Sequence, residues 1–173
     1  MPIYAGIGSR ETPDHILKLM EDIAVVLAQR GWVLRSGLAG GADQAFHVGA
    51  TMAKGQQENY IPWKGFNGAN AQAIVAPDLP NWEDALGISS QFHPAWDKCS
   101  EGAKKLHGRN LYQIAGKNLD LPVDCVVCWT KNGQEIGGTA QAMRIAKHLQ
   151  IPIFNLFFDD HINKLNHFVL QLE

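Results

Sequence analysis

The sequence predicts an α/β fold: a three-layer, Rossmann-like arrangement with a mainly parallel sheet flanked by helices. Short apolar runs alternate with longer segments whose apolar residues recur at helical spacing. Three of these runs lead into glycine-containing turns and then a helix, which is typical of parallel βα units. With 173 residues, 46% hydrophobic and 18% charged, we assign residues 1–173 to one domain with a substantial core.

The first βαβ unit begins at the N-terminus. Ile3-Tyr4-Ala5 is a short strand, and the turn Gly6-Ile7-Gly8-Ser9-Arg10 follows it. Thr12 is the expected N-cap and Pro13 the first helical residue, because proline has no N–H to leave unpaired there. Apolar residues then recur at helical spacing as far as Leu27, Gly31 ends the helix, and Trp32-Val33-Leu34 forms the next strand.

The second turn is the richest in small residues. Ser36 to Ala50 reads SGLAGGADQAFHVGA, in which Gly37, Gly40 and Gly41 would let an anion approach the main chain at a helix start. Asp43 falls in the first turn of that helix. Its carboxylate is expected either to cap the helix or to contact a ligand, and the sequence leaves both roles open.

After the strand Tyr60-Ile61, residues 62–96 look like an irregular, aromatic-rich insertion, which in a compact domain is usually functional or contains short hidden elements. We expect most of its aromatic residues to form a small satellite core and a minority to offer a stacking wall for a base. These residues are Trp63, Phe66, Trp82, Phe92 and Trp96. His93 is expected to be structural, with a proton-donor role as the alternative.

The last third of the chain predicts a further βα turn. A helix from Lys104 to Gly116 carries Arg109 and Asn110 at its middle, and the strand Val123 to Trp129 follows it. Gly137, Gly138 and Thr139 then open a helix that runs to Gln150, which suits a bound phosphate or simple capping. Ile153-Phe154-Asn155 is the last strand, before a terminal helix from Asp159 to Leu172.

Composition narrows the classes of function. A net charge of -2 and a pI near 6.4 give no basic field for strong nonspecific nucleic-acid binding. No apolar stretch is long enough to span a membrane and no signal segment opens the chain, so we expect a cytoplasmic protein without a membrane partner. Cys125 and Cys128 should point to opposite faces of a strand, and the histidines lack paired zinc spacing. We therefore expect no metal and no cofactor.

Four motifs together resemble one family. GIGSR, SGLAGGADQAFHVGA, GRNLYQIAG and GGTAQA occur in the order seen in the Rossmann-like domain of the DNA-processing protein DprA/Smf. That domain is similar to the wider SLOG superfamily of nucleotide-binding proteins, which includes the LOG-type phosphoribohydrolases. The resemblance spans most of the chain and implies a Rossmann-like core that commonly forms homodimers.

The leading hypothesis is binding of a nucleotide or a nucleotide-derived ligand, such as a nucleoside phosphate or an ADP-ribose-like compound, at the carboxyl ends of the strands. The turns would hold phosphate, and Arg109 with Asn110 would close the site. The predicted ligand-binding residues are Gly6, Gly8, Ser9, Arg10, Arg35, Ser36, Gly37, Gly40, Gly41, Asp43, Arg109, Asn110, Gly137, Gly138 and Thr139.

Three alternatives stay open. Resemblance to DprA implies single-stranded DNA binding through Arg35, Arg109 and the glycine loops, although the chain has only five arginines. Resemblance to LOG proteins implies an enzyme that hydrolyses nucleotide N-glycosidic bonds, which needs a carboxylate near the ribose. Ala142 stands where the LOG pattern places that glutamate, so Glu135 and Asp43 are the candidate catalytic groups, with Glu11 as a further one. A purely structural or partner-binding role is the third.

Overall fold

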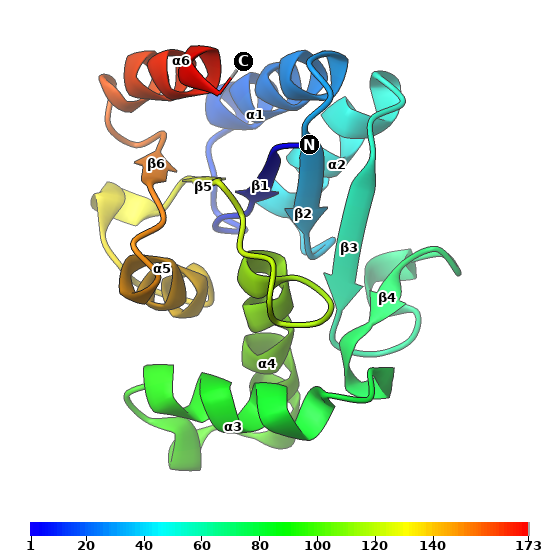
Figure 1. Ribbon diagram of the computed structural model, residues 1–173. Coiled ribbons are helices and arrows are strands. Elements are labelled where there is room, and N and C mark those ends of the chain that lie inside the picture. Colours follow the sequence, from blue (N-terminus) through cyan, green and yellow to red (C-terminus); the bar gives the residue numbers. More distant parts are fainter. Residues whose placement is uncertain (173) are drawn as a thin grey trace.

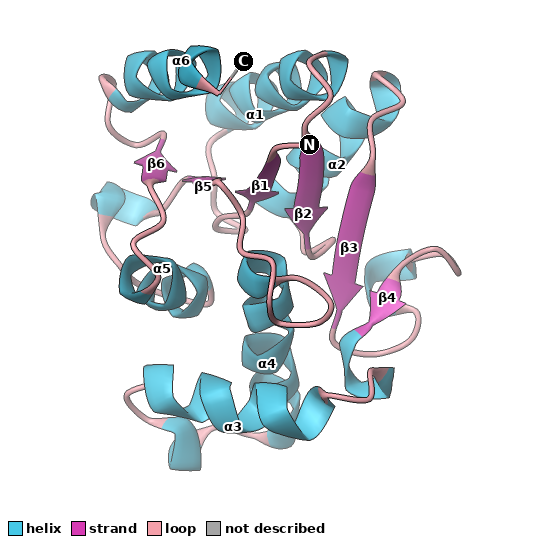
Figure 2. Cartoon of the chain, in the orientation of Figure 1, coloured by secondary structure: helices cyan, strands magenta, loops and turns pink. Residues whose placement is uncertain are grey.

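Six parallel strands form the central sheet of the protein, in the order β4-β3-β2-β1-β5-β6 (Figures 1 and 2). The computed structural model describes residues 1–172. The strands are β1 (Ile3–Gly6), β2 (Val33–Ser36), β3 (Gln57–Ile61), β4 (Ile74–Val75), β5 (Cys125–Cys128) and β6 (Ile153–Asn155). Every neighbouring pair is parallel, and Tyr4 of β1 lies between Leu34 of β2 and Cys125 of β5. The predicted α/β class is confirmed.

Helices cover both faces of this sheet. On one face lie α1 (Asp14–Gln29), α2 (Ala42–Met52) and α6 (His161–Gln171), and on the other lie α4 (Glu101–Ala115) and α5 (Thr139–His148), with α3 (Trp82–Phe92) packed outside them (Figure 1). The indole of Trp82 stacks on the ring of Tyr112, so α3 is held by α4 rather than by the sheet.

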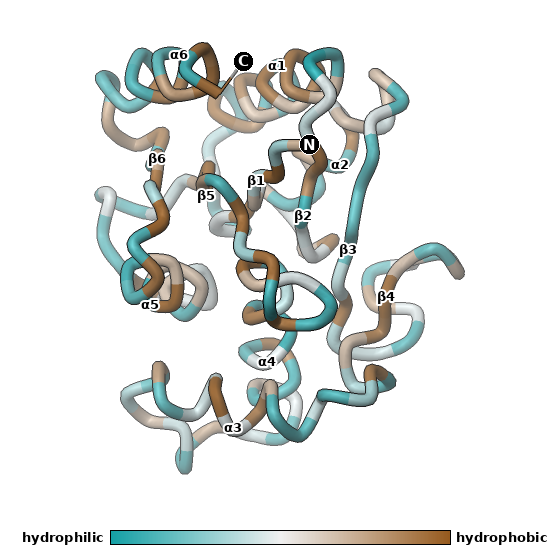
Figure 3. Tube along the Cα trace, in the orientation of Figure 1, coloured by the Kyte–Doolittle hydropathy of each residue, from teal (hydrophilic) through white to brown (hydrophobic). Residues whose placement is uncertain are grey.

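The core is divided by the sheet into two layers, because successive strand residues face opposite sides. Tyr4 and Cys125 belong to the layer under α1 and α2, whereas Ala5 and Cys128 belong to the layer under α4 and α5. The prediction that Cys125 and Cys128 point to opposite faces is therefore confirmed. Figure 3 shows that hydrophobic and hydrophilic stretches alternate along α1 and α6, as expected for helices with one face on the core.

The strand order reverses next to β1. Strands β2, β3 and β4 follow one another to one side of β1, and the chain then crosses back to place β5 and β6 on the other side. In open α/β sheets such a reversal leaves a crevice beyond the carboxyl ends of the two adjoining strands. The loops after β1 and β5 meet at that edge, since the backbone of Ser9 donates to the carbonyl of Trp129 over 3.1 Å.

Several local expectations differ from the structure. Helix α1 has Pro13 as its N-cap, and the hydroxyl of Thr12 instead donates to the Ser9 carbonyl over 2.6 Å. Helix α4 begins at Glu101, three residues earlier than expected, because the hydroxyl of Ser100 accepts from the N–H of Ala103. The strand expected from Val123 to Trp129 keeps only the residues of β5.

The region 62–96 is more regular than the sequence indicates. It contains β4 and the whole of α3, joined by short 3-10 turns. Helix α3 escapes detection because its two fully buried positions are the small Ala85 and the polar Ser89, while its larger apolar residues Trp82, Ile88 and Phe92 are only partly buried. The expected satellite core is present in part, as Phe66 packs with Leu38 and Ile61.

Candidate functional site

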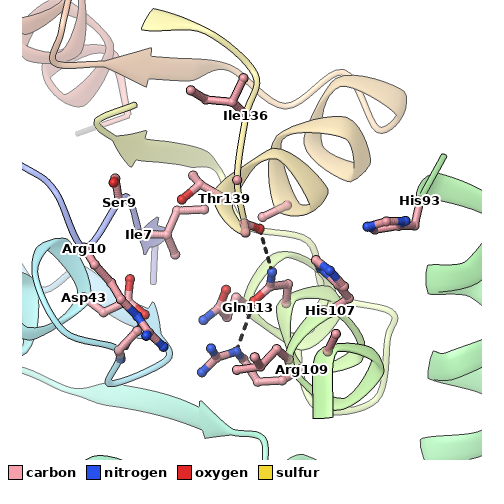
Figure 4. A pocket seen from close by; sticks show the side chains of 18 residues that line it. Ile7, Ser9, Arg10, Asp43, His93, His107, Arg109, Gln113, Ile136 and Thr139 are labelled. Atoms are coloured by element: carbon pink, nitrogen blue, oxygen red, sulfur yellow. Dashed lines mark hydrogen bonds between the residues drawn. The ribbon is translucent and has the colours of Figure 1, made fainter. Parts of the chain in front are cut away.

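A pocket of about 600 Å³ lies at the point where the strand order reverses. Its walls come from the loop after β1, the loop before α5, the start of α2 and one side of α4 (Figure 4). Nine predicted site residues line it: Gly8, Ser9, Arg10, Asp43, Arg109, Asn110, Gly137, Gly138 and Thr139. All three predicted glycine turns therefore contribute to this pocket. The first and third line it with glycines, whereas the second lines it with Ala39 and Asp43.

Asp43 fills the second glycine turn from inside. Its side chain is only 4% exposed, and one carboxylate oxygen accepts from the backbone N–H of Ala39 at 3.3 Å. Burial raises the pKa of Asp43 to about 6, while Arg109 and the N–H groups of Ala39, Gly8 and Gly37 counter part of that shift. Donors that the sequence leaves available to a phosphate therefore serve the protein's own carboxylate. The N–H groups that Asp43 accepts from belong to loops outside α2, so its carboxylate anchors the turn instead of capping the helix. It also lines the pocket, and its contact with a ligand stays a prediction.

Two glycines of this turn are required by close packing. Gly41 has a φ of 78°, and a Cβ there would lie 2.7 Å from the Cα of Arg10, so the second turn rests directly on the first. A Cβ at Gly37 would collide with the guanidinium of Arg109. These glycines allow two loops and a buried arginine to approach one another.

Arg109 lies inward under the second turn, from the middle of α4. Its side chain is 4% exposed, and Nη1 donates to the carbonyl oxygens of Gly37 at 2.6 Å and Tyr60 at 2.9 Å. The guanidinium also lies 5.4 Å from the ring centre of Phe66. Burial lowers the pKa of Arg109 to about 10, with Asp43 opposing that effect. The arginine remains charged at neutral pH and is the main counter-charge for Asp43.

Asn110 connects this arginine to the third turn. Its side-chain oxygen accepts from Nε of Arg109 at 3.0 Å, and its Nδ2 donates to the carbonyl of Gly138 at 3.0 Å (Figure 4). Gly138 is the N-cap of α5, and no side chain caps that helix start. The first N–H groups of α5 are therefore left without a side-chain acceptor, beside the pocket wall formed by Gly137, Gly138 and Thr139.

Arg10 gives the pocket its remaining positive charge. It is exposed, it lines the pocket, and its charge contributes to lowering the pKa of Arg109. Burial lowers the pKa of His107, which also lines the pocket, to about 4, and lowers that of His93 as well. Both imidazoles are then neutral at pH 7. With Asp43 and Arg109 offsetting each other, Arg10 leaves the pocket suited to an anion.

The other predicted residues lie outside the lining. Arg35 is 2% exposed and points away from the crevice, where its Nε donates to Glu58 at 2.7 Å and its Nη1 to the Leu121 carbonyl at 2.6 Å. Ser36 donates to the Gly6 carbonyl at 2.6 Å and so holds β2 to β1. The pocket lining does not include Gly6, Arg35, Ser36, Gly37, Gly40, Gly41, Glu11 or Glu135. Glu135 pairs with Lys147 at the surface.

Part of the sequence matches a known family, and the whole fold resembles solved structures. Residues 1–62, which carry the first two glycine turns, match the family model described as DNA recombination-mediator protein A. No curated protein matches the sequence. The Moco carrier protein of Chlamydomonas reinhardtii is similar in structure, with a TM-score of 0.53 and 16% identity over 89% of this chain and 74% of that chain.

A second solved structure is DNA processing protein A (DprA) from Streptococcus pneumoniae. It gives a TM-score of 0.52 and 18% identity over 90% of this chain and 50% of that chain. The chain shares a Rossmann-like α/β fold with these two proteins. It spans half the length of the DprA chain that it matches.

The pocket lining also includes residues that were not predicted to bind a ligand. They are Ile7, Ala39, His93, Ala103, Leu106, His107, Gln113, Ile136 and Ala142. Among these, the sequence draws attention only to His93, as a structural residue or a proton donor, and to Ala142, at the position of the LOG glutamate. The helical spacing of Leu106, Arg109 and Gln113 was the available signal, because residues three and four apart share one face of α4. The lining includes none of the five aromatic residues considered for base stacking. No helix within residues 1–172 combines the length and apolar character that a membrane span requires.

Proposed function

We propose that the protein binds a nucleotide or a nucleotide-derived ligand in this pocket. The observation that carries the proposal is the start of α5, which lies at the pocket wall without a side-chain cap, in a pocket that the exposed cation Arg10 also lines. The second glycine turn already holds Asp43, so the third turn is the proposed phosphate site. The sugar would then lie toward Asp43, whose carboxylate is a suitable acceptor for ribose hydroxyls.

The size of the pocket supports a small-molecule ligand. About 600 Å³ falls within the usual range of small-molecule sites. Ile7, Leu106 and Ile136 supply apolar lining on which the flat face of a base could rest. The name of one structural neighbour, the Moco carrier protein, also supports binding of a small molecule in a fold of this kind.

The test is equilibrium dialysis of the purified protein against nucleoside mono-, di- and triphosphates, ADP-ribose and molybdenum cofactor, with bound and free fractions analysed by mass spectrometry. Gly138→Val is the informative variant. A Cβ at Gly138 meets nothing within 4 Å and its φ of -64° is ordinary, so the fold should tolerate the change. Gly87→Val in α3 is the matched control, because its Cβ also meets open space.

We expect Gly138→Val to weaken binding at least about tenfold, since a branched side chain at the helix start would hinder a phosphate from reaching the first N–H groups of α5. Gly87→Val should bind like the wild-type protein. Equal affinity of both variants and the wild type for every bound ligand would exclude the start of α5 as the phosphate site. No retention of any compound would reject nucleotide binding itself.

A second candidate function is hydrolysis of a nucleotide N-glycosidic bond, and Asp43 is the observation that favours it. A carboxyl group with a pKa of about 6 can hold or release a proton near neutral pH, as acid–base chemistry at a ribose requires. Asp43→Asn should abolish release of free base while ligand is still retained. Glu135→Gln is the control that should leave turnover unchanged, because Glu135 lies outside the pocket lining. If the wild-type protein retains the ligand intact and releases no free base, hydrolysis is rejected and only ligand binding remains.

The predicted homodimer and cytoplasmic location remain predictions. Sedimentation equilibrium of the purified chain tests the first, and fractionation of the source cells tests the second.

A further inference from the structure

Three side chains with metal-binding atoms meet at one rim of the pocket. His93 follows the end of α3, Cys99 precedes α4, and His107 lies within α4. One ligand atom from each lies within 4.8 Å of the other two. The rings of His93 and His107 are 4.5 Å apart between centroids, and the Cys99 sulfur lies 3.8 Å from Nε2 and 3.9 Å from Nδ1 of His93.

These separations are close to those of a tetrahedral zinc site. Zinc–nitrogen bonds of about 2.0 Å and zinc–sulfur bonds of about 2.3 Å place neighbouring ligand atoms roughly 3.3 to 3.6 Å apart. The ligand atoms therefore have to come closer together by at most about 1.5 Å to bind an ion. Such movements are within the reach of side chains that are neither fully buried nor bound to many partners, and all three residues are partly exposed.

His107 also has an unused nitrogen. Its Nδ1 is buried and has no hydrogen-bond partner among residues 1–172. A buried imidazole nitrogen without a partner is unfavourable, and a coordinated metal ion is one way to satisfy the ring. The thiol of Cys99 makes long contacts, with the Ala95 carbonyl at 3.5 Å and with the two ring nitrogens of His93 at 3.8 and 3.9 Å. Neither group gives up a strong interaction when it binds an ion.

Binding of an ion would cost His93 one hydrogen bond. Its Nδ1 accepts from the backbone N–H of Ala95 at 3.0 Å. Coordination through Nδ1 takes that lone pair, and coordination through Nε2 moves the ring proton to Nδ1, so the hydrogen bond to Ala95 is lost in either case. One backbone hydrogen bond is a small loss beside a zinc–imidazole bond.

We propose that His93, Cys99 and His107 form a binding site for one zinc ion, with a fourth coordination position left open. Two neutral nitrogen ligands and a thiolate suit this borderline-soft ion, and binding would release the Cys99 proton. Within the described residues no fourth histidine, cysteine, aspartate or glutamate joins the cluster. Three protein ligands with one open position are typical of zinc sites that bind water or substrate.

The open coordination position of the zinc ion would face the pocket. His93 and His107 both line the pocket, on the α4 side that faces the start of α5 (Figure 4). A zinc ion held there would add positive charge at the rim, where an anionic ligand could complete its coordination. The site goes beyond nucleotide binding and does not depend on it, because the three ligands are separate from the phosphate site at Gly138.

The first test measures metal binding directly. Zinc affinity is obtained by competition with a chromophoric chelator, and cobalt(II) is added separately because a cobalt–thiolate bond gives an intense near-ultraviolet absorption. We expect one ion per chain and a cobalt–thiolate band in the wild-type protein. Cys99→Ser should remove the band, and His107→Gln should weaken zinc binding at least about a hundredfold. His15→Gln, an exposed histidine outside the cluster, is the matched control.

The second test uses the wild-type chain and so does not depend on how a variant folds. Cys99 is partly exposed, whereas Cys125 and Cys128 are buried, so iodoacetamide should alkylate Cys99 selectively in the native protein. Zinc should slow that reaction at least about tenfold, and magnesium should not. An unchanged alkylation rate with zinc, or a cobalt spectrum without a thiolate band, would overturn the proposal.

Discussion

Arg109 donates from Nη1 to the carbonyl oxygen of Gly37 across 2.6 Å, joining two residues that are 72 positions apart in the chain. The same nitrogen also reaches the Tyr60 carbonyl at 2.9 Å. The arginine therefore fastens α4 to the ends of β2 and β3 while its charge offsets that of Asp43. Its first role is to build the pocket floor, and contact with a ligand can only be additional.

Replacement of this arginine should cost stability. Arg109→Lys keeps the charge but loses the fork that serves two carbonyls and Asn110 at once. We expect the free energy of unfolding to fall by about 2 to 4 kcal/mol, because buried acceptors lose their donors. Urea unfolding measures the change. Arg10→Lys at the exposed arginine should stay within about 0.5 kcal/mol of the wild type, and equal losses in both variants would contradict the assigned role.

Asp43 should make stability depend on pH. The pKa of Asp43 is about 6 in the folded protein, above its ordinary value of 3.8, so between these values the folded protein binds more protons than the unfolded chain. The favourable contribution is complete below pH 4 and is lost as the pH rises through 6. The difference corresponds to about 3 kcal/mol at most.

Asp43→Asn isolates this effect, since other groups titrate in both proteins. The difference in unfolding free energy between the variant and the wild type, measured with urea from pH 4 to pH 8, should change in favour of the variant as the pH rises. A difference that stays constant over this range would mean that the carboxyl group titrates normally.

Arg35 should contribute to the fold and leave the ligand unaffected. Its guanidinium is buried between Glu58 and the Leu121 carbonyl, outside the pocket lining. Arg35→Gln should lower the unfolding free energy by about 2 to 4 kcal/mol through loss of this ion pair. The affinity of the folded variant for any nucleotide retained by the wild type should be unchanged in dialysis. If Arg35→Gln instead lost affinity for the nucleotide and kept the wild-type stability, Arg35 would have to contact the ligand.

Gly41 and Gly40 are adjacent and should respond differently to alanine. Gly41 has a φ of 78° and no room beside Arg10, whereas a Cβ at Gly40 meets nothing within 4 Å. We expect Gly41→Ala to lower the unfolding free energy by about 2 kcal/mol or more and Gly40→Ala to change it by less than about 0.5 kcal/mol. Thermal and urea unfolding of the pair check this, and similar values for both would show that the loops do not touch as described.

Single-stranded DNA binding can be tested by its salt dependence. Arg35 and Arg109, the arginines that this alternative relies on, are both buried, and Arg10 is the exposed arginine at the pocket. We expect weak binding of an oligonucleotide with a slope of log affinity against log salt of about -1 to -2, and a further loss in Arg10→Ala. A steep slope would reveal many phosphate contacts and favour the DNA reading.

The sequence by itself determined the fold class, the positions of five of the six strands and the position of the three glycine turns. These features follow from local rules, because a period of two or 3.6 residues and a glycine before a helix constrain the nearby backbone directly. The same rules failed where the local signal was weak. Helix α3 fully buries only Ala85 and Ser89, and its larger apolar residues are partly exposed. Helix α4 begins at Glu101 because Ser100 caps it, a cue that a serine alone gives only weakly.

Only the tertiary structure decided which groups meet. Asp43 fills the second glycine turn, Arg109 lies under that turn, and Arg35 pairs with Glu58 outside the pocket lining. His93, Cys99 and His107 stand six and eight positions apart without any zinc-like spacing, yet they come together where the end of α3 packs on α4. Such meetings depend on how helices pack across the sheet, and packing joins residues whose separation along the chain carries no signal.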